Sequence, residues 1–415
     1  MRYLIGFSCA LALIVTAMAG CSDGNAGSGS ETYAWCQVDD PDGRQELAAV
    51  SFVDAEIGTV VGGIYRTTDA GRTWTVQESP TPMSRELDVV FTDANTGTIV
   101  GTLGTISRTT DGGAEWVAQD SGTEEDLHGV SFVDANTGMV VGDGGTILKT
   151  TDGGATWGAL NSGTDAALRG VWLVDAMTAT AVGADGTILR TTDGGASWVP
   201  EDSGTAFTLN AVSFADVGTG IAVGDAGTML RTTDGGATWM TQDIGTSFEL
   251  NDVSFADATV GTVVGEQGTI LRTTDGGATW TVEESDASYT NMDGIQGATF
   301  RGVSMADADN GVAVGGPFEY IVQRTTVSDD FGVCDPWCAK NLECYPDLVQ
   351  GCNTDCLCDL RYHGLISAEC EGALAAGIKC LTALTCEQIE SFLFDNPDDH
   401  PCSAAQDRYE MACSS

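Results

Sequence analysis

Short runs of apolar and β-branched residues alternate with turn-forming residues through most of the chain. One stretch places such runs at residues 130–133, 139–141 and 146–151. The residues between these runs are rich in Asp, Asn and Gly, which favour tight turns. A fourth run begins at Trp157. This pattern predicts four short antiparallel strands in one unit of about 40 residues.

The unit repeats along the chain, and its most visible marker is a tryptophan. The marker residues are Trp74, Trp116, Trp157, Trp198, Trp239 and Trp280. Their spacing is regular, at about 41 residues. A period near 40 to 45 residues with four strands per unit is typical of a β-propeller.

Seven units begin in the sequence, whereas six end in the marker tryptophan. The units start at Val50, Val89, Val130, Val171, Val212, Val253 and Val303. The interval from Trp35 to Val50 equals the interval from Trp74 to Val89. We therefore predict an all-β, seven-bladed propeller of four-stranded antiparallel blades over residues 33–330. Residues 33–38 would close blade seven and remove the open sheet edges.

The tryptophan ends the pattern Thr-x-Asp-x-Gly-x-Thr-Trp, an Asp box, in which Glu115 and Ser197 replace the second Thr in two copies. The box residues are Asp69, Asp111, Asp152, Asp193, Asp234 and Asp275. An Asp side chain can accept hydrogen bonds from turn amides, and Gly permits a positive φ. A catalytic acid or a calcium ligand is the competing interpretation. Six near-identical copies favour a structural role, and we predict no metal and no cofactor.

The longer unit resembles one particular family. Residues 130–138, Val-Ser-Phe-Val-Asp-Ala-Asn-Thr-Gly, lead into residues 140–157, which end in the box. This unit is similar to the photosystem II stability/assembly factor family, and the resemblance covers residues 33–328. It implies a non-enzymatic propeller that binds protein and assists assembly of a membrane complex. The N-terminal residues 1–21 and the cysteine-rich segment 334–415, described below, depart from the photosynthetic members.

Asp boxes also occur in sialidases, so a carbohydrate-binding or sialidase-like propeller is the alternative function. Those enzymes resemble one another in an Arg-Ile-Pro motif, three arginines and a tyrosine nucleophile. That motif is absent here, and the four tyrosines of the predicted propeller (Tyr33, Tyr65, Tyr289 and Tyr320) have no evident catalytic setting. We therefore predict no catalytic residues. The expected partner is a protein or envelope complex, with a glycan as the other possibility.

The N-terminal segment has the pattern of an export signal. Arg2 precedes an apolar stretch over residues 4–17, and residues 18–21 read Met-Ala-Gly-Cys. This resembles a bacterial lipobox, which implies a signal peptide over 1–20 and lipidation of Cys21; an ordinary signal peptide is the alternative. Residues 21–32 would form a flexible tether. We expect an exported, lipid-anchored protein of the bacterial cell envelope.

The formal net charge is −43. Such a chain repels phosphate backbones and anionic lipid headgroups, which excludes nucleic acid as an expected partner. Membrane association would then rest on the lipid anchor alone. We expect a monomer.

Two positions that recur in each unit are candidate binding features. A cation recurs on the predicted third strands, at Arg66, Arg108, Lys149, Arg190, Arg231, Arg272 and Arg324. It would form either a basic array or a set of pairs with acidic loop residues. A variable position precedes the first strands, at Ala48, Asp88, His128, Arg169, Asn210, Asn251 and Arg301. These residues would either form a ring around one mouth of the channel or belong to ordinary solvated loops that vary freely.

A third candidate is an insertion between blades six and seven. The interval from Trp280 to Val303 is longer than the equivalent interval in blades three to six, such as that from Trp157 to Val171. The extra residues include Tyr289 and Met292 and would rise on the same face as the variable ring. Loops on a rigid scaffold often carry binding residues.

The composition changes sharply in the C-terminal segment, over 334–415. This segment holds Cys334, Cys338, Cys344, Cys352, Cys356, Cys358, Cys370, Cys380, Cys386, Cys402 and Cys413. Such a density in an exported chain predicts a small disulfide-rich domain, mainly helical over 365–384 and 385–394, with zinc as the rival interpretation. The segment holds eleven cysteines, an odd number that cannot all pair within it, and Cys36 brings the total to twelve. We predict a Cys36–Cys334 disulfide across the propeller closure.

Overall fold

The computed structural model describes residues 32–38, 47–81, 84–283, 298–316 and 320–327. These residues belong to the first of two compact units, Met1–Asp335. The second unit, Pro336–Ser415, lies outside the described residues. No helix among the described residues is long and apolar enough to cross a membrane.

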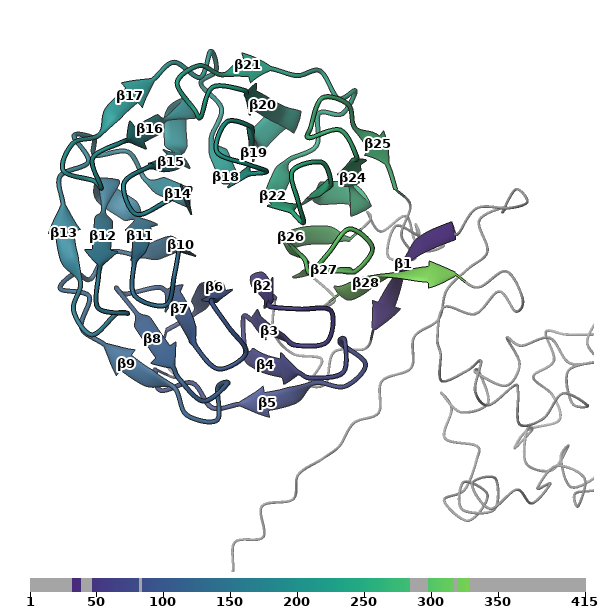
Figure 1. The fold of residues 1–415 in the computed structure, drawn as a ribbon, viewed down its shortest axis with the longest axis horizontal. Helices are drawn as coiled ribbons and strands as arrows, with labels where there is room; N and C mark the ends of the chain where they lie inside the picture. The colour runs from purple at the N-terminus through teal and green to yellow at the C-terminus, as the bar shows by residue number, and fades with distance from the viewer. Residues whose placement is uncertain (1–31, 39–46, 82–83, 284–297, 317–319, 328–415) are drawn as a thin grey trace, which may run out of the picture. The chain divides into compact units, whose positions relative to one another are not determined.

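The described residues form seven four-stranded antiparallel sheets around a central channel (Figure 1). The predicted seven-bladed propeller is therefore confirmed. Blade 1 comprises β2 (Ala49–Phe52), β3 (Gly58–Val61), β4 (Ile64–Thr67) and β5 (Thr75–Gln77). Blade 2 comprises β6 (Glu86–Phe91), β7 (Gly97–Gly101), β8 (Ile106–Thr109) and β9 (Val117–Gln119). Blade 3 comprises β10 (Leu127–Phe132), β11 (Gly138–Gly142), β12 (Ile147–Thr150) and β13 (Gly158–Leu160).

The remaining blades follow the same order of strands. Blade 4 comprises β14 (Leu168–Leu173), β15 (Ala179–Gly183), β16 (Ile188–Thr191) and β17 (Val199–Glu201). Blade 5 comprises β18 (Leu209–Phe214), β19 (Gly220–Gly224), β20 (Thr228–Thr232) and β21 (Met240–Thr241). Blade 6 comprises β22 (Leu250–Phe255), β23 (Gly261–Gly265), β24 (Ile270–Thr273) and β25 (Thr281–Val282). Blade 7 comprises β26 (Thr299–Met305), β27 (Gly311–Gly316), β28 (Tyr320–Val327) and β1 (Thr32–Val38).

Blade 7 joins the two ends of the repeat array. β1 pairs antiparallel with β28, and Trp35 lies opposite Arg324 in the register. The N-terminal strand is thus the outermost strand of the last blade, at the place where the sequence pattern puts the closing strand. This pairing links the first and last units through backbone hydrogen bonds, so that neither sheet edge is left open there.

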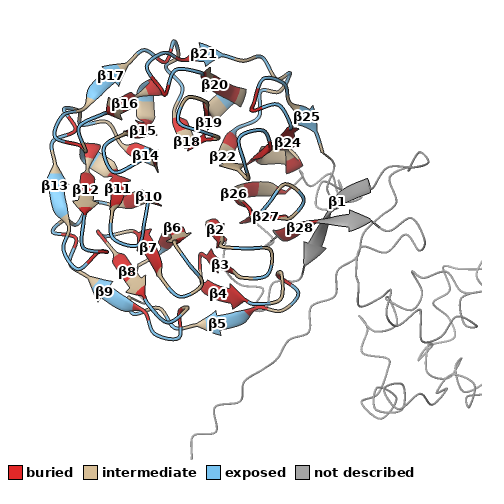
Figure 2. Cartoon of the chain, viewed as in Figure 1, coloured by how far each residue is buried: buried red, intermediate tan, exposed pale blue. Residues whose placement is uncertain are grey.

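The core lies between blades rather than within one. Trp116 of blade 2 packs in a buried cluster that includes Val61 and Ile64 of blade 1. In five blades the marker tryptophan also meets the Phe of its own first strand in an edge-to-face contact, as in Phe214–Trp239 at 6.0 Å between centroids. The second strands are fully buried, whereas the outermost strands of blades 1 to 6 face solvent (Figure 2). One buried apolar cluster therefore lies at each interface between neighbouring blades.

The disc has two faces with different chain connections. On one face, the turn between the first and second strands is bonded to the Asp box, as in Gly153 N–H donating to Asn136 O at 2.9 Å. We call this the box face. On the opposite face, the loop that enters each blade is bonded to the turn between the second and third strands, as in Asp143 N–H donating to Asp126 O at 2.9 Å. We call this the loop face.

The turns of the loop face require glycine at one position. In blades 3 to 6 they form the short 3₁₀ turns η1 (Asp143–Gly145), η2 (Ala184–Gly186), η3 (Asp225–Gly227) and η4 (Glu266–Gly268). Gly145 has φ +70°, and a Cβ there would lie 2.0 Å from Thr164 O in the loop entering the next blade. Any larger residue would displace that loop, so this glycine sets the contact between neighbouring blades.

Candidate functional site

The Asp-box carboxylates are bonded within their own turns. The Asp234 carboxylate accepts hydrogen bonds from Thr238 N–H at 2.9 Å, from the Thr238 hydroxyl at 2.7 Å and from the Thr232 hydroxyl at 2.8 Å. The Thr238 hydroxyl and amide together lower the pKa of Asp234 to about 2. A carboxylate with these partners stays ionised and is fixed in place, which suits a turn clamp better than a proton donor.

The same arrangement recurs in the other boxes. The pKa of Asp193 and that of Asp275 are lowered to about 2, chiefly by the hydroxyls of Ser197 and Thr279. Asp111 lacks such a hydroxyl because Glu115 occupies that position, and the Glu115 amide is the main cause of its lowered pKa. The hydrogen bonds of each box aspartate therefore depend on the residue at the second Thr position, as expected for a carboxylate that stabilises its own turn.

Several third-strand cations reach across to the next blade. Four of them donate to the carbonyl that follows the next box aspartate: Arg108 to Gly153 O, Lys149 to Gly194 O, Arg190 to Gly235 O and Arg231 to Gly276 O. Lys149 Nζ does so at 2.8 Å and Arg190 Nε at 2.7 Å. These side chains fasten neighbouring blades together.

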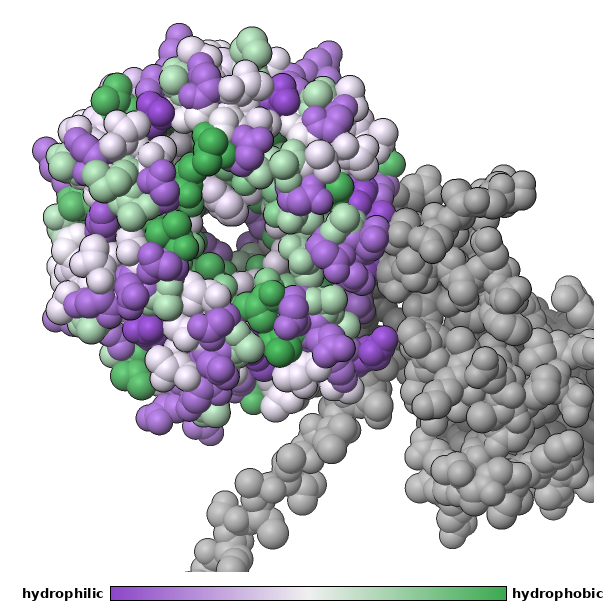
Figure 3. All heavy atoms as spheres, in the orientation of Figure 1, coloured by the Kyte–Doolittle hydropathy of each residue, from purple (hydrophilic) through white to green (hydrophobic). Residues whose placement is uncertain are grey.

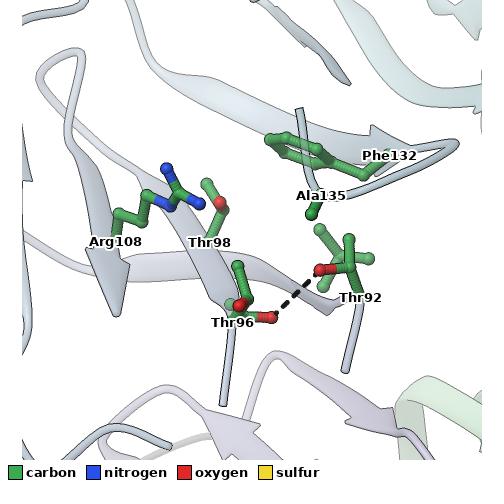
Figure 4. Close-up of a pocket in the computed structure, with 8 residues that line it drawn as sticks. Thr92, Thr96, Thr98, Arg108, Phe132 and Ala135 are labelled. Atoms are coloured by element: carbon green, nitrogen blue, oxygen red, sulfur yellow. Dashed lines mark hydrogen bonds between the residues drawn. The ribbon is translucent and has the colours of Figure 1, made fainter. Parts of the chain in front are cut away.

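Figure 4 shows the cleft between blades 2 and 3 that Arg108 lines. Arg108 extends from β8 beside Thr98, and Phe132 and Ala135 of blade 3 lie opposite. The cleft that these residues line leaves no volume accessible to water. The guanidinium therefore fills the interface and leaves no room there for a ligand.

The remaining array residues are buried. Arg66 donates to Thr59 Oγ1 at 2.8 Å and lies 4.6 Å above the Phe91 ring. Arg272 and Arg324 both approach Glu283, at 3.7 and 3.3 Å. Pairing with acidic residues, one of the two interpretations of this position, thus describes Arg272 and Arg324. Backbone carbonyls are the partners of Arg108, Lys149, Arg190 and Arg231 instead.

The variable ring lies at the loop-face end of the first strands. In blades 2 to 7 the register shifts at this position, which forms a bulge in the first strand. His128 Nε2 lies 2.8 Å from Asp143 Oδ1. Asn210 donates to Asp225 Oδ1 and to Leu250 O of blade 6, each at 3.1 Å. Asn251 similarly donates to Phe300 O of blade 7 at 2.7 Å.

One assignment to this ring was wrong. Glu86 pairs with Gly101 and Asp88 with Val100, so the bulged residue of blade 2 is Leu87. Asp88 occupies the position after the bulge. In five other blades the residue at this position in the strand register is a glycine or an alanine. The corrected ring is Ala48, Leu87, His128, Arg169, Asn210, Asn251 and Arg301. Arg169 is exposed and Arg301 half-buried.

Asp88 and Asp252 occupy the same position in blades 2 and 6, and the sequence pattern had not singled out Asp252. Asp88 accepts a hydrogen bond from Val130 N–H of blade 3 at 2.8 Å, and Asp252 accepts one from Val303 N–H of blade 7 at 2.8 Å. Burial raises the pKa of each to about 7, and the charge of Asp88 further raises that of Asp252. An acidic residue where other blades have Gly or Ala was the available signal.

Several predicted sites lie outside the described residues. They are Cys21, Tyr289 and Met292, and the cysteines from Cys334 to Cys413. Cys36 lies on β1, opposite Gln323 in the register, and its side chain is likewise outside the description. The lipidation, the disulfides and the insertion therefore remain predictions.

Within the described ranges, no group of three or more His, Cys, Asp or Glu side chains is placed to hold a metal ion. A shallow cleft of about 270 Å³ lies on the rim, lined by Thr187, Trp198 and Pro200 among others. Figure 3 shows the central channel open in the middle of the disc, with hydrophobic residues near its rim. The bulge positions that differ between blades lie at the loop-face mouth of this channel.

Fold and boxes together define a seven-bladed Asp-box propeller. The family described as photosynthesis system II assembly factor YCF48 matches residues 77–201, 156–249 and 237–327, which is more than half of the chain. The chain therefore belongs to this family. No curated protein matches it.

Solved structures with the same fold include members of that family and an enzyme. "YCF48 bound to D1 peptide" is 20% identical with a TM-score of 0.58, and the match covers 78% of this chain and all of that one. "YCF48 from Cyanidioschyzon merolae" is 20% identical with a TM-score of 0.56, covering 70% and 98%. "Streptogramin B lyase structure" is 13% identical with a TM-score of 0.61, covering 71% and 98%. At these identities the likeness establishes the fold alone.

Proposed function

We propose that this protein is a non-catalytic assembly factor of the cell envelope that binds a segment of a partner protein. The observation that carries the proposal is the match to the assembly-factor family over residues 77–327. One similar structure is described as bound to a peptide, which supports a peptide or protein segment as the kind of ligand.

The geometry of the boxes and third strands supports the same function. The box carboxylates are held by turn hydroxyls and amides, and the third-strand cations are held between blades. The repeated polar groups are thus committed to the scaffold. The bulge positions of the first strands, which vary between blades, lie around one mouth of the channel, and variable positions on a rigid frame suit recognition.

The anchor is part of the proposal. Lipidation at Cys21, followed by a tether over residues 21–32, would hold the propeller near the membrane surface. A partner in or beside that membrane would then meet the propeller at a high effective concentration.

Crosslinking in native membranes, followed by purification of the full chain, tests the proposal. The expected result is co-purification of one defined envelope protein complex, lost when Cys21→Ala releases the protein from the membrane and regained when the soluble variant is supplied at high concentration. Binding on a glycan array, with no protein complex recovered, would overturn it in favour of a carbohydrate-binding propeller.

A further inference from the structure

The loops that enter the blades on the loop face differ at one equivalent position. It lies two residues before the residue that precedes the bulge of each first strand, which is Glu86 in blade 2 and Leu or Phe in blades 3 to 7. In these blades the position holds Ser84, Glu125, Ala166, Phe207, Phe248 and Ala298. Phe207 and Phe248 belong to neighbouring blades 5 and 6. Their side chains are 54% and 46% exposed. Two aromatic residues thus replace small or polar ones at adjacent places on one face.

Both phenylalanines stand on ordered backbone. Phe207 N–H donates to Thr205 Oγ1 and Phe248 N–H to Thr246 Oγ1, each at 3.1 Å. The next residue in each loop, Thr208 or Glu249, accepts a hydrogen bond from the second turn of its own blade, at 3.0 and 2.9 Å. Because the loops are fixed on both sides, the rings are displayed without a large entropic cost of ordering on binding.

Carboxylates lie in the loops that carry this aromatic pair and in the turns bonded to those loops. Glu249 follows Phe248 in the chain and is exposed overall. Partial desolvation of its carboxyl, together with the negative charges of Glu266 and Asp225, raises the pKa of Glu249. Residues 202–210, 225–228, 243–252 and 266–269, which form the loops and turns here, contain no Lys or Arg. Arg169 and Arg301 of the flanking blades are the cations of the variable ring. A cation placed among these carboxylates would relieve their mutual repulsion.

We propose that this aromatic–acidic patch, made by Phe207, Phe248, Asp225, Glu249 and Glu266, docks a segment of a partner protein in which basic side chains alternate with apolar ones. The inference rests on the proposed function and names the chemistry of its partner. Lysine or arginine would meet the carboxylates and the ring faces, and apolar side chains would cover the exposed rings. A second copy of this chain, with its formal charge of −43, would be repelled.

Three short synthetic peptides serve as probes for the full-length protein. One alternates lysine with leucine, one alternates lysine with serine, and one alternates glutamate with leucine. We expect the lysine–leucine peptide to bind at least roughly tenfold more tightly than the lysine–serine peptide, because the rings contribute apolar contact. The glutamate–leucine peptide should not bind. Binding should weaken as ionic strength is raised.

Matched variants separate the patch from the general negative charge. The variant Phe207→Ser/Phe248→Ser should weaken lysine–leucine binding roughly tenfold, whereas Leu103→Ser should change it less than about twofold. Leu103 is a suitable control because it is also exposed on the loop face, in blade 2. Similarly, Glu249→Gln/Glu266→Gln should weaken binding, whereas Glu124→Gln/Glu125→Gln, which removes two charges from the loop entering blade 3, should not. Unchanged circular dichroism and thermal unfolding establish that each variant is folded.

Equal binding by Phe207→Ser/Phe248→Ser and wild-type protein would overturn the patch. So would a wild-type preference for the lysine–serine peptide over the lysine–leucine peptide. The membrane complex recovered by crosslinking distinguishes failure of the patch proposal from failure of the proposed assembly function. If the phenylalanine variant recovers that complex as well as wild type does, the patch is wrong and the assembly function stands. If wild type recovers no complex, the assembly function fails by itself.

Discussion

The box face and the loop face use the same kinds of side chain for different purposes. On the box face, aspartates such as Asp193, Asp234 and Asp275 recur at one position, and turn hydroxyls lower the pKa of each to about 2. On the loop face, Glu249 has a pKa raised by burial and by neighbouring carboxylates. Asp88 and Asp252, in the channel, have pKa values raised to about 7. The box aspartates that recur in the blades thus have lowered pKa values, whereas Asp88, Glu249 and Asp252, which depart from the repeat, have raised ones.

This difference indicates where the repeat serves the fold and where it has been free to change. A side chain that recurs in each blade and has all its partners inside the blade or its neighbour contributes to stability. A side chain that departs from the repeat and lacks a neutralising partner is costly unless it gains something elsewhere. We therefore expect substitutions of the first kind to change folding and substitutions of the second kind to change binding or pH response.

The largest expected effect comes from the channel carboxyls. Between about pH 4 and pH 7 the folded protein holds protons on Asp88 and Asp252 that the unfolded chain has released, because burial raises both pKa values to about 7. The free energy of unfolding should therefore fall as pH rises through this window, by up to about 1.4 kcal/mol per pH unit for each group. Urea unfolding at about pH 5 and pH 8 measures this change.

Substitution by the residues of other blades should remove the pH dependence. Asp88→Gly matches Gly129 of blade 3, and Asp252→Ala matches Ala211 of blade 5. The double variant should lose most of the difference between the two pH values. Asp234→Ala, whose carboxyl has a pKa of about 2 below this window, should keep it. A double variant with the wild-type slope would show that these carboxyls do not titrate there.

Loss of a box carboxylate should have the next largest effect. Asp234→Ala removes three bonds to Thr232 and Thr238 and should lower the free energy of unfolding by about 1–2 kcal/mol, as loss of a side-chain cap does. Asp111→Ala should cost less, since Glu115 supplies no hydroxyl bond. Chemical denaturation of both variants checks the order. Equal losses would mean that the hydroxyl bond adds nothing to the turn.

Because the pKa of Asp234 is depressed, its contribution should be present above about pH 4 and lost as pH falls toward about 2. This is the opposite sign to the channel carboxyls. The two groups of carboxyls can thus be separated by pH in a single series of unfolding measurements on the wild-type protein.

A third-strand cation should contribute about 1 kcal/mol through its bond to the next blade. Arg231→Met keeps the aliphatic stem and removes the Nε donor that lies 3.2 Å from Gly276 O. Arg72→Met, at an exposed arginine inside a box turn, is the matched control and should be nearly neutral. Thermal unfolding compares them. If Arg231→Met left stability unchanged and weakened partner binding, the third-strand cations would instead act as a basic array that binds the partner.

The smallest expected effect on stability is that of the exposed phenylalanines. Phe207→Ser/Phe248→Ser should change the free energy of unfolding by less than about 0.5 kcal/mol per site, because both rings are about half exposed. Phe214→Ala in the same blade should cost about 3–5 kcal/mol, because Phe214 is buried against Trp239. A large loss in the serine variant would make the pair structural.

The sequence was sufficient for the fold because the period is regular and local chemistry determines each element. The spacing of Trp74 to Trp280 gave the number of blades once Trp35 was included. The boxes likewise contain their own hydrogen-bond partners within one short turn, as Asp234 and Thr238 do. Such short-range patterns can be read directly from the order of residues.

The sites were harder to predict because they depend on contacts between blades. The alignment at Asp88 failed by one position, since the bulge at Leu87 becomes visible only in the strand register. The partners of Arg190 and Arg231 are carbonyls 45 residues away, which no local pattern marks. Phe207 and Phe248 stand out only when the position is compared around the ring and its exposure is known.

We propose that this propeller recognises its partner through the loop face. A photoreactive phenylalanine analogue placed at Phe248 on the loop face and, separately, at Val217 on the box face tests it in native membranes. Val217 is 76% exposed in the first turn of blade 5, so both positions are accessible to a partner. We expect crosslinks to an envelope protein from position 248 and few or none from position 217. Crosslinks to that protein from position 217, with none from position 248, would contradict it.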